Sequence, residues 1–131
     1  MSHFTKVATK IKDLVALKRA LDQLGWKYTE STEGVVVRGY RGQTMKAEIA
    51  IDKGKYDVGV VKNADGTYEF VADWWGIETT RGETEQQIAQ EVEAKYAYQR
   101  VLIAVEEQGY TVDENTVSED GTVKLTVSKW G

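Results

Sequence analysis

The spacing of hydrophobic positions changes near residue 13. Residues 4–11 alternate apolar and polar side chains, which is typical of a half-buried β-strand. From Asp13 onward, leucines recur every three or four residues, which predicts a helix with one apolar stripe (Leu14, Leu17, Leu21 and Leu24). Asp13 can cap the start of this helix, and Gly25 can end it in a left-handed conformation. The chain therefore opens with a strand and an amphipathic helix.

The middle of the chain reads as a series of strands. Residues 26–30 and 35–40 predict a hairpin around a Ser-Thr-Glu-Gly turn, and residues 45–51 predict a further strand. Residues 56–62 and 67–74 predict two more strands, separated by an Asn-Ala-Asp-Gly turn in which Asp-Gly readily supplies a positive φ. No proline interrupts these segments. We therefore expect an antiparallel meander.

The last third of the chain predicts a helix and a hairpin. Residues 83–108 form one long helix candidate, with acidic residues at its start, where the helix dipole favours them, and Gly109 at its end. The acidic residues Glu83, Glu85, Glu91 and Glu93 are most simply a solvated helix face. Residues 110–115 and 122–130 then predict a hairpin around Ser-Glu-Asp-Gly. This order of elements predicts a single α+β domain over residues 1–131.

Two segments of the chain resemble each other. Residues 17–30 (LKRALDQLGWKYTE) align with residues 101–114 (VLIAVEEQGYTVDE) without a gap, with alanine, glycine and glutamate at matching positions. We interpret this as a duplicated β-α-β-β unit, with halves at residues 4–40 and 68–130, joined by the strand meander. Any helix followed by a hairpin would look similar, so coincidence is the alternative. The duplication predicts a mostly antiparallel sheet with two helices on one face.

Composition limits the chemistry. Cysteine is absent, which excludes disulfides, thiolate metal sites and thiol nucleophiles. The net charge of −4 disfavours non-specific nucleic-acid binding, which depends on cations that neutralise phosphates. No apolar run is long enough for a signal peptide or a membrane span. We expect a cytoplasmic protein without membrane insertion, or a stromal one if it is encoded in a plastid.

Catalytic signatures are missing from the sequence. His3 is the only histidine, and it stands in the first four residues, where chain ends usually fray. There is no His-carboxylate cluster with metal-ligand spacing, and no glycine-rich phosphate-binding motif. We therefore predict no catalytic residues, no metal and no cofactor.

The best candidate site is the bend Arg38-Gly39-Tyr40-Arg41-Gly42. Two guanidinium groups flank an aromatic ring there, and arginine can bind a carboxylate or phosphate through two parallel hydrogen bonds. The simpler interpretation is a strand that enters a turn, with Arg38 paired across the sheet.

Two further aromatic segments are candidates for binding. Trp74 and Trp75 are adjacent, so on a strand one ring points inward and the other outward, and an outward tryptophan often marks a contact surface. The alternative is that Trp75 folds back over the core. Tyr96 and Tyr98 cannot share one helical face, which leaves one of them, with Tyr98 as the candidate, available to a partner.

The sequence also resembles a known family. The opening MSHFTKVATKIKD, the block VRGYRGQTMKAEIAI, the FVADWWG and KYAYQ segments and the end DGTVKLTVSKW together resemble the "hypothetical chloroplast reading frame" family numbered thirty-five. The resemblance covers nearly the whole chain. It implies a conserved protein of cyanobacteria, red-lineage plastids, other bacteria and phages, in a domain family of unknown function with no catalytic residues, cofactor or substrate to transfer. It also suggests a role connected with photosynthetic cells.

Our functional expectation is a non-enzymatic binding or assembly module. It would dock onto a protein partner, such as a photosynthetic or ATPase-linked complex, through Arg38, Tyr40, Arg41 and one ring of the tryptophan pair. The alternatives are a single-stranded nucleic-acid-binding sheet and an enzyme that acts on a small metabolite. The sequence leaves the partner and the oligomeric state open.

Overall fold

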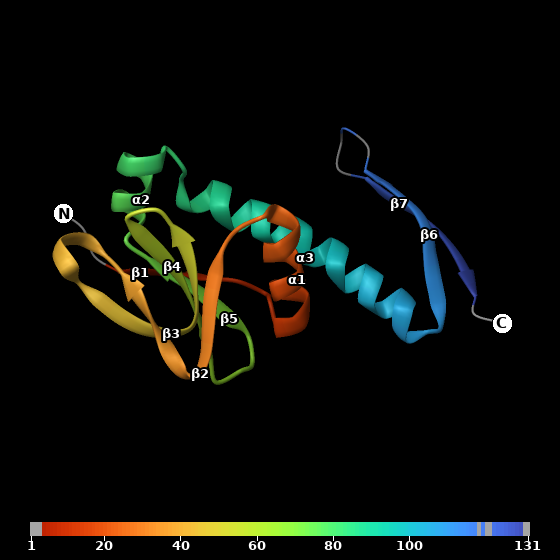
Figure 1. Ribbon diagram of the computed structural model, residues 1–131, viewed down its shortest axis with the longest axis horizontal. Coiled ribbons are helices and arrows are strands. Elements are labelled where there is room, and N and C mark those ends of the chain that lie inside the picture. Colours follow the sequence, from red (N-terminus) through yellow and green to blue (C-terminus); the bar gives the residue numbers. More distant parts are fainter. Residues whose placement is uncertain (1–3, 118, 120–121, 130–131) are drawn as a thin grey trace.

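The computed structural model describes residues 4–117, 119 and 122–129. Figure 1 shows a β-sheet body, helices against it, and a hairpin that projects at one end. The helices and strands are β1 (Thr5–Ala8), α1 (Leu14–Leu24), β2 (Tyr28–Arg38), the 3₁₀ turn η1 (Tyr40–Gly42), β3 (Thr44–Lys53), β4 (Tyr56–Lys62), β5 (Tyr68–Ala72), α2 (Trp74–Arg81), α3 (Glu85–Glu107), β6 (Tyr110–Val117) and β7 (Val123–Lys129).

The strands form two antiparallel sheets. The first has five strands in the order β1-β5-β4-β3-β2, and the second consists of β6 and β7 alone. Every neighbouring pair of strands is antiparallel. The predicted α+β class and mostly antiparallel sheet are therefore confirmed. Within the described residues, no helix is long and apolar enough to cross a membrane.

The two predicted helices lie on one face of the five-stranded sheet. The apolar stripe of α1 contributes Leu17 and Leu21 to the core, and the first half of α3 contributes Ile88 and Val92. These side chains pack on fully buried residues of the sheet, which are Ile49, Ile51, Val58, Val60 and Phe70. The caps predicted for α1 are present: Asp13 accepts a hydrogen bond from the Ala16 amide, and Gly25 has a φ of 74°.

β2 is one bulged strand, which corrects the predicted hairpin over residues 26–40. Residues 28–30 and 35–38 both pair with β3, with a shift of register between Glu30 and Val35. The Ser-Thr-Glu-Gly segment is therefore an irregular bulge, in which four residues of β2 stand opposite Glu48 of β3. The two halves do not pair with each other because β3 offers both of them a continuous partner.

The bulge lets the second half of β2 bend over the sheet face that lies opposite the helices. Val37 and Ala47 form a second core cluster there with Ala50. Gly59 of β4 makes this possible, because a Cβ on Gly59 would stand 2.8 Å from a Val37 methyl group. The sheet is therefore covered on both faces over part of its area.

The segment after β5 also differs from the prediction. The strand predicted over residues 67–74 ends at Ala72, and Trp74 begins the helix α2, which was predicted as loop. Asp73 turns the chain, because its side chain accepts a hydrogen bond from the Gly76 amide as an N-cap. Gly76 is buried against Tyr56, where a Cβ would stand 2.8 Å from the ring.

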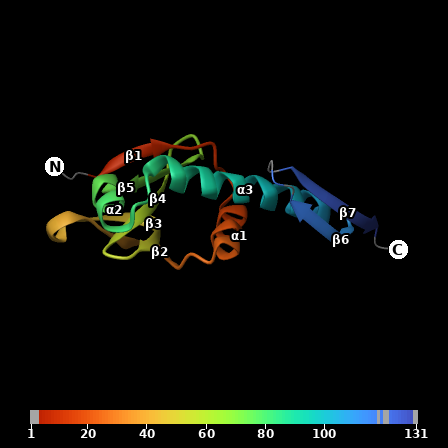
Figure 2. The same ribbon diagram turned by 90° about the horizontal axis from the view of Figure 1, so that it is seen from above.

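The C-terminal hairpin stands apart from the body. α3 runs beyond the sheet and α1, and β6–β7 follows at its far end (Figures 1 and 2). Among the side chains that the structure describes, neither core cluster contains a residue of β6 or β7. Apart from α2, which lies between β5 and α3, the order β5-α3-β6-β7 repeats the order β1-α1-β2-β3, but β6 and β7 form their own sheet. The duplication of the two halves stays a prediction.

Candidate functional site

The carboxylate of Asp73 joins two segments that are distant in sequence. Asp73 is buried, with 1% of its surface exposed. One carboxylate oxygen accepts a hydrogen bond from the Gly76 amide at the start of α2 (3.1 Å), and the other accepts one from the Tyr40 amide in the turn after β2 (3.2 Å). The turn at Tyr40 and the first turn of α2 are thereby held together.

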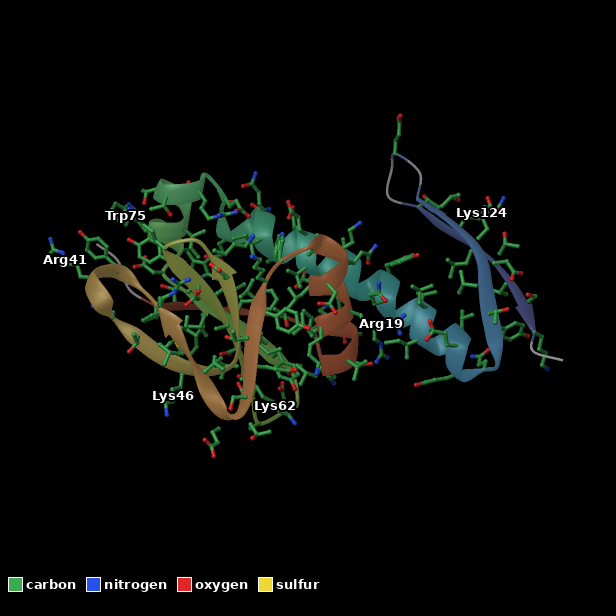
Figure 3. All side chains as sticks on the ribbon, viewed as in Figure 1. Arg19, Arg41, Lys46, Lys62, Trp75 and Lys124 are labelled. Atoms are coloured by element: carbon green, nitrogen blue, oxygen red, sulfur yellow. The ribbon has the colours of Figure 1, made fainter. Side chains whose placement is uncertain are left out.

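Tyr40, Arg41 and Trp75 form one cluster, which we call the aromatic–arginine patch. The rings of Tyr40 and Trp75 meet edge to face, with centroids 6.0 Å apart. The guanidinium carbon of Arg41 lies 5.2 Å from the centroid of the Tyr40 ring, in a cation–π contact. Trp75 is 51% exposed, so the patch faces solvent near the end of the molecule opposite the hairpin (Figure 3).

The backbone at Arg41 is unusual. Its φ of 55° makes it the one residue other than glycine with a positive φ in the described part of the chain. A left-handed conformation costs a residue with a Cβ about 1–2 kcal/mol. The turn holds this conformation through a hydrogen bond from the Gly39 amide to the Gln43 carbonyl (2.7 Å).

Arg41 also differs from the other arginines in its partners. Arg19, Arg38, Arg81 and Arg100 each form an ion pair with a carboxylate. For Arg41, the contact that the structure gives is the Tyr40 ring, and no described carboxylate lies within ion-pair distance. Arg41 is also exposed to solvent.

Arg38 does not belong to the patch. Its guanidinium donates two hydrogen bonds to Asp57, at 2.9 and 2.7 Å, and one to Asp52 at 3.2 Å. The hydrogen bonds from Arg38 to Asp57 raise the pKa of this guanidinium above its usual value. Asp57 is 5% exposed, and Arg38 neutralises this buried charge. The simpler interpretation of Arg38, an ion pair across the sheet, describes its geometry.

One tryptophan points inward and the other outward, as predicted for a strand, although both lie on the helix α2. Trp74 is 8% exposed and belongs to the core, where its indole N–H donates to the Thr5 carbonyl (2.8 Å). Trp75 points outward into the patch. Trp74 therefore anchors β1 to α2 and has no free surface to offer a partner.

The tyrosines of α3 lie away from the patch. Tyr96 packs against the core, and its hydroxyl accepts hydrogen bonds from the amides of Lys12 and Asp13, both at 3.1 Å. Tyr98 is half-buried and stands roughly 20 Å along the helix axis from Glu85, at the usual rise per residue. His3 lies outside the described residues.

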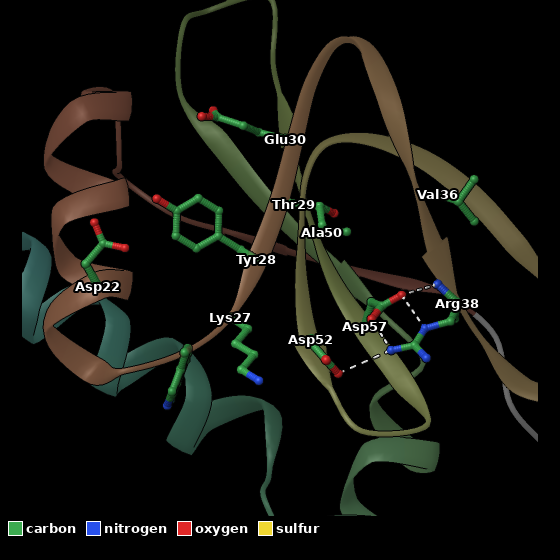
Figure 4. A pocket seen from close by; sticks show the side chains of 11 residues that line it. Asp22, Lys27, Tyr28, Thr29, Glu30, Val36, Arg38, Ala50, Asp52 and Asp57 are labelled. Atoms are coloured by element: carbon green, nitrogen blue, oxygen red, sulfur yellow. Dashed lines mark hydrogen bonds and ion pairs between the residues drawn. The ribbon is translucent and has the colours of Figure 1, made fainter.

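A groove of about 1030 Å³ opens between the two halves of β2 (Figure 4). Tyr28 and Glu30 line one side, Val36 and Arg38 line the other, and Ala50 forms the floor. Burial, followed by the negative charge of Asp22, raises the pKa of Tyr28 above its usual value. The charged groups at the lower end of the groove form ion pairs, because Arg38 binds both Asp52 and Asp57. Within the described residues, no cluster of His, Cys, Asp or Glu could hold a metal ion.

Next to the groove lies a buried lysine that sequence analysis missed. Lys53 is 2% exposed, its ammonium nitrogen lies 3.4 Å from the centroid of the Trp26 ring, and it donates to Glu83 at 3.0 Å. Burial alone would raise the pKa of Glu83, but hydrogen bonds from Arg81 and Lys53 outweigh it and hold that pKa below its usual value. Lys53 and its neighbours come from four different helices, strands or loops. No local sequence pattern therefore predicts that they meet.

Asp73 was also missed as a site residue. Its only signal in the sequence is the residue type, because Asp is a preferred N-cap residue and Asp73 directly precedes the first residue of α2. Asp73 also accepts a hydrogen bond from the Tyr40 amide, which joins residues 33 positions apart in the sequence. Only the three-dimensional structure reveals this second contact.

Comparisons with known proteins agree on the relatives of this chain. It is 34% identical over 137 aligned positions to "Uncharacterized protein ycf35" of Guillardia theta, and the alignment covers 99% of this chain and 98% of that protein. Proteins of the same name from Cyanophora paradoxa and Pyropia yezoensis are 31% and 33% identical, with 99% of this chain and 98% of each relative covered. No solved structure matches the chain. Residues 20–126 match the family described as "Protein of unknown function (DUF1257)", so the chain belongs to this family, together with the ycf35 proteins.

Proposed function

We propose that this protein is a non-enzymatic docking module that binds a partner protein through the aromatic–arginine patch. The observation that carries the proposal is Arg41, an arginine without a carboxylate partner among the described residues, held over Tyr40 beside an exposed tryptophan. Arginine, tyrosine and tryptophan are the residues that most often dominate binding energy at protein interfaces.

The patch is organised before any partner arrives. Asp73 fixes the Tyr40 amide, the edge-to-face contact orients Trp75, and the turn holds Arg41 in its left-handed conformation. A surface whose side chains are already ordered loses less conformational entropy on binding. Backbone strain that the surrounding structure maintains is also common at binding sites. These features support a role in recognition.

The chemistry of the patch defines the partner. A guanidinium group binds a carboxylate through two parallel hydrogen bonds, and the Trp75 indole adds apolar contact area. The partner surface should therefore present an Asp or Glu side chain next to apolar residues. The net charge of −4 disfavours a nucleic acid as the partner. The family resemblance directs the search to complexes of photosynthetic cells.

The test is an affinity capture with the tagged protein and three variants, after nuclease treatment of the lysate. Arg41→Glu reverses the charge of the patch, and Trp75→Ala removes its exposed ring. Lys62→Glu is the matched control, because it makes the same charge change at an exposed site on β4 away from the patch (Figure 3).

The proposal predicts a protein that is captured by the native chain and by Lys62→Glu. Arg41→Glu and Trp75→Ala should each weaken its binding about tenfold or more, the range expected for an interface hot spot. A captured protein that both patch variants retain would overturn the proposal. Retention of nucleic acid when nuclease is omitted, and of no protein, would favour the single-stranded nucleic-acid alternative.

A further inference from the structure

The groove between the two halves of β2 carries more negative than positive charge. Its lining holds four carboxylates and two cationic side chains, which are Asp22, Glu30, Asp52, Asp57, Lys27 and Arg38. Arg38 is shared by Asp52 and Asp57, so one negative charge stays uncompensated at the lower end of the groove (Figure 4). At the upper end, Glu30 pairs with Lys18 of α1 at 3.3 Å. Even with Lys18 counted, carboxylates outnumber cations, so the groove attracts a positively charged group.

Apolar surface lies between these charged groups. Ala50, with 5% of its surface exposed, forms the floor, and Val36, with 53% exposed, stands on the wall opposite Tyr28. Lysine and arginine side chains bury their aliphatic stems along apolar surface while their charged heads stay in contact with water. The lining is therefore complementary to a lysine or arginine side chain, and less so to a cation without an apolar part.

The wall that holds Val36 also offers an unpaired stretch of backbone. β2 is an edge strand of the five-stranded sheet and pairs with β3. Residues of an antiparallel strand alternately direct both backbone groups toward the partner strand and away from it. The Gly39 amide donates to the Gln43 carbonyl, on the side of β3. The Arg38 amide instead donates to the Asp57 carboxylate in the groove, at 2.8 Å. Val36, two residues before Arg38, therefore directs its N–H and C=O toward the groove, where no described strand pairs with them.

From this combination we infer that the groove binds an extended, basic segment of a partner polypeptide. The backbone of the segment pairs with the N–H and C=O of Val36, as in the addition of a strand to a sheet edge. A lysine or arginine of the segment lays its stem over Ala50 and Val36 and places its charge beside Asp52. Main-chain hydrogen bonds then hold the segment, and the negative groove selects a basic one.

The size of the groove also favours a polypeptide segment. Pockets that enclose a drug-sized molecule measure about 300–1,000 Å³. The groove has about 1030 Å³, which is at the upper limit of that range. A cation of the size of one lysine side chain occupies a small part of this volume, whereas an extended segment of several residues occupies the groove along its length.

This binding site is separate from the proposed function. Tyr40, Arg41 and Trp75 of the aromatic–arginine patch do not line the groove. The patch presents a cation to a carboxylate, and the groove presents carboxylates to a cation. Either surface can therefore fail its test while the other passes.

The experiment is a titration of the full, isotope-labelled chain, followed through the NMR signals of its backbone amides. The probe is a hexapeptide with blocked ends that alternates lysine and valine, so that its lysines share one face when it is extended. We expect saturable shifts at Val36, Thr29 and Asp52, which lie in the groove. The dissociation constant should rise with salt, because the contact is partly electrostatic.

Two further probes separate charge from backbone pairing. The same hexapeptide with glutamate in place of lysine keeps the backbone and reverses the charge. The n-butylammonium ion keeps the amine and the aliphatic stem of lysine and has no backbone. Each of these two probes should bind about tenfold more weakly than the lysine peptide, or weaker still.

Variants of the chain test the position of the site. Val36→Lys places a positive charge in the groove and should weaken binding of the lysine peptide about tenfold or more. Val101→Lys is the matched control, because it makes the same change at a 49% exposed valine of α3 outside the lining. Asp22→Asn removes one carboxylate from the lining at constant size and should weaken binding about twofold to fivefold, the effect of one exposed ion pair. Spectra without peptide show whether each variant is folded, and Asp22→Asn decides the test if Val36→Lys is not.

The inference is wrong if the lysine peptide causes no saturable shifts up to millimolar concentration, or if the shifts lie away from the groove. A folded Val36→Lys that binds the peptide as tightly as the native chain, or equal weakening by Val101→Lys, also contradicts it. Equal affinity for the glutamate peptide would exclude recognition of charge. Equal affinity for n-butylammonium would exclude pairing with the backbone of Val36.

Discussion

The units α1–Gly25–β2 and α3–Gly109–β6 share their local signals but differ in their surroundings. Both helices end at a glycine with positive φ, 74° at Gly25 and 84° at Gly109, and both continue into a strand. β2 joins a five-stranded sheet that α1 and α3 cover, whereas β6 joins β7 alone. Local sequence therefore determines the helix, the residue at which it ends and the strand that follows. The tertiary context determines whether that strand is stabilised by a larger sheet and a packed core.

The largest expected effect comes from matched leucine deletions in the two units. Leu21→Ala removes a fully buried side chain of α1 and should lower the free energy of unfolding by about 2–5 kcal/mol. Leu125→Ala removes a half-buried side chain of the hairpin and should cost about 1 kcal/mol or less. Urea denaturation measures both losses. Equal losses would show that the hairpin belongs to the same cooperative core as the body.

A smaller effect is expected from the two glycines. Gly25→Ala and Gly109→Ala each force a Cβ into a left-handed conformation, at about 1–2 kcal/mol, and neither Cβ would meet another atom within 4 Å. Gly25→Ala should lower global stability by that amount, because β2 is part of the main sheet. Gly109→Ala should act mainly on the hairpin, where hydrogen exchange of β6 and β7 would accelerate while the urea midpoint changes little. If the urea midpoint falls by a comparable amount in both variants, the hairpin unfolds together with the main sheet and the two units do not differ in stability.

The smallest effect concerns the contact that fixes the strand after Gly25. Trp26 packs on Lys53, which is paired with Glu83. Because the pKa of Glu83 is lowered in the folded state, its contribution to stability is present above the pKa of an unfolded glutamate, about 4.3, and is lost as pH falls through the folded value. Stability of the native chain should therefore fall more steeply below about pH 5 than that of Glu83→Gln.

Urea titrations at a series of pH values measure this difference. Glu107→Gln, at the exposed end of α3, is the matched control and should leave the steepness unchanged. A Glu83→Gln variant with the same pH dependence as the native chain would show that this carboxylate contributes no acid-sensitive stability.

The sequence predicted most of the elements because their signals are local. The leucine spacing, Asp13 and Gly25 define α1, and the long helix ends one residue from its predicted end. The hairpin predicted within residues 26–40 was wrong because strand pairing depends on which partner is available, and β3 competes successfully for both halves of β2. α2 was missed because the apolar pair Trp74–Trp75 continues a strand pattern, and only the cap at Asp73 marks the change.

The sequence predicted which residue types belong to the candidate site, but it did not predict which of these residues contact one another. Tyr40, Arg41 and Trp75 were all candidates, but the contact that joins them depends on the buried carboxylate of Asp73. Arg38 was a candidate on the same grounds, yet Asp57, 19 residues later, occupies its guanidinium. Whether an arginine is free or paired depends on which strands become neighbours.

The position of β1 has a consequence for the order of folding. Thr5–Ala8 pairs with residues 69–72 of β5, and Trp74 donates a hydrogen bond to the Thr5 carbonyl. β1 precedes β5 in the chain and therefore has no partner until β5 has been made, and closing so long a loop is slow compared with local hairpin formation. During synthesis, β2, β3 and β4 can pair with their sequence neighbours as they emerge, whereas β1 completes the sheet last.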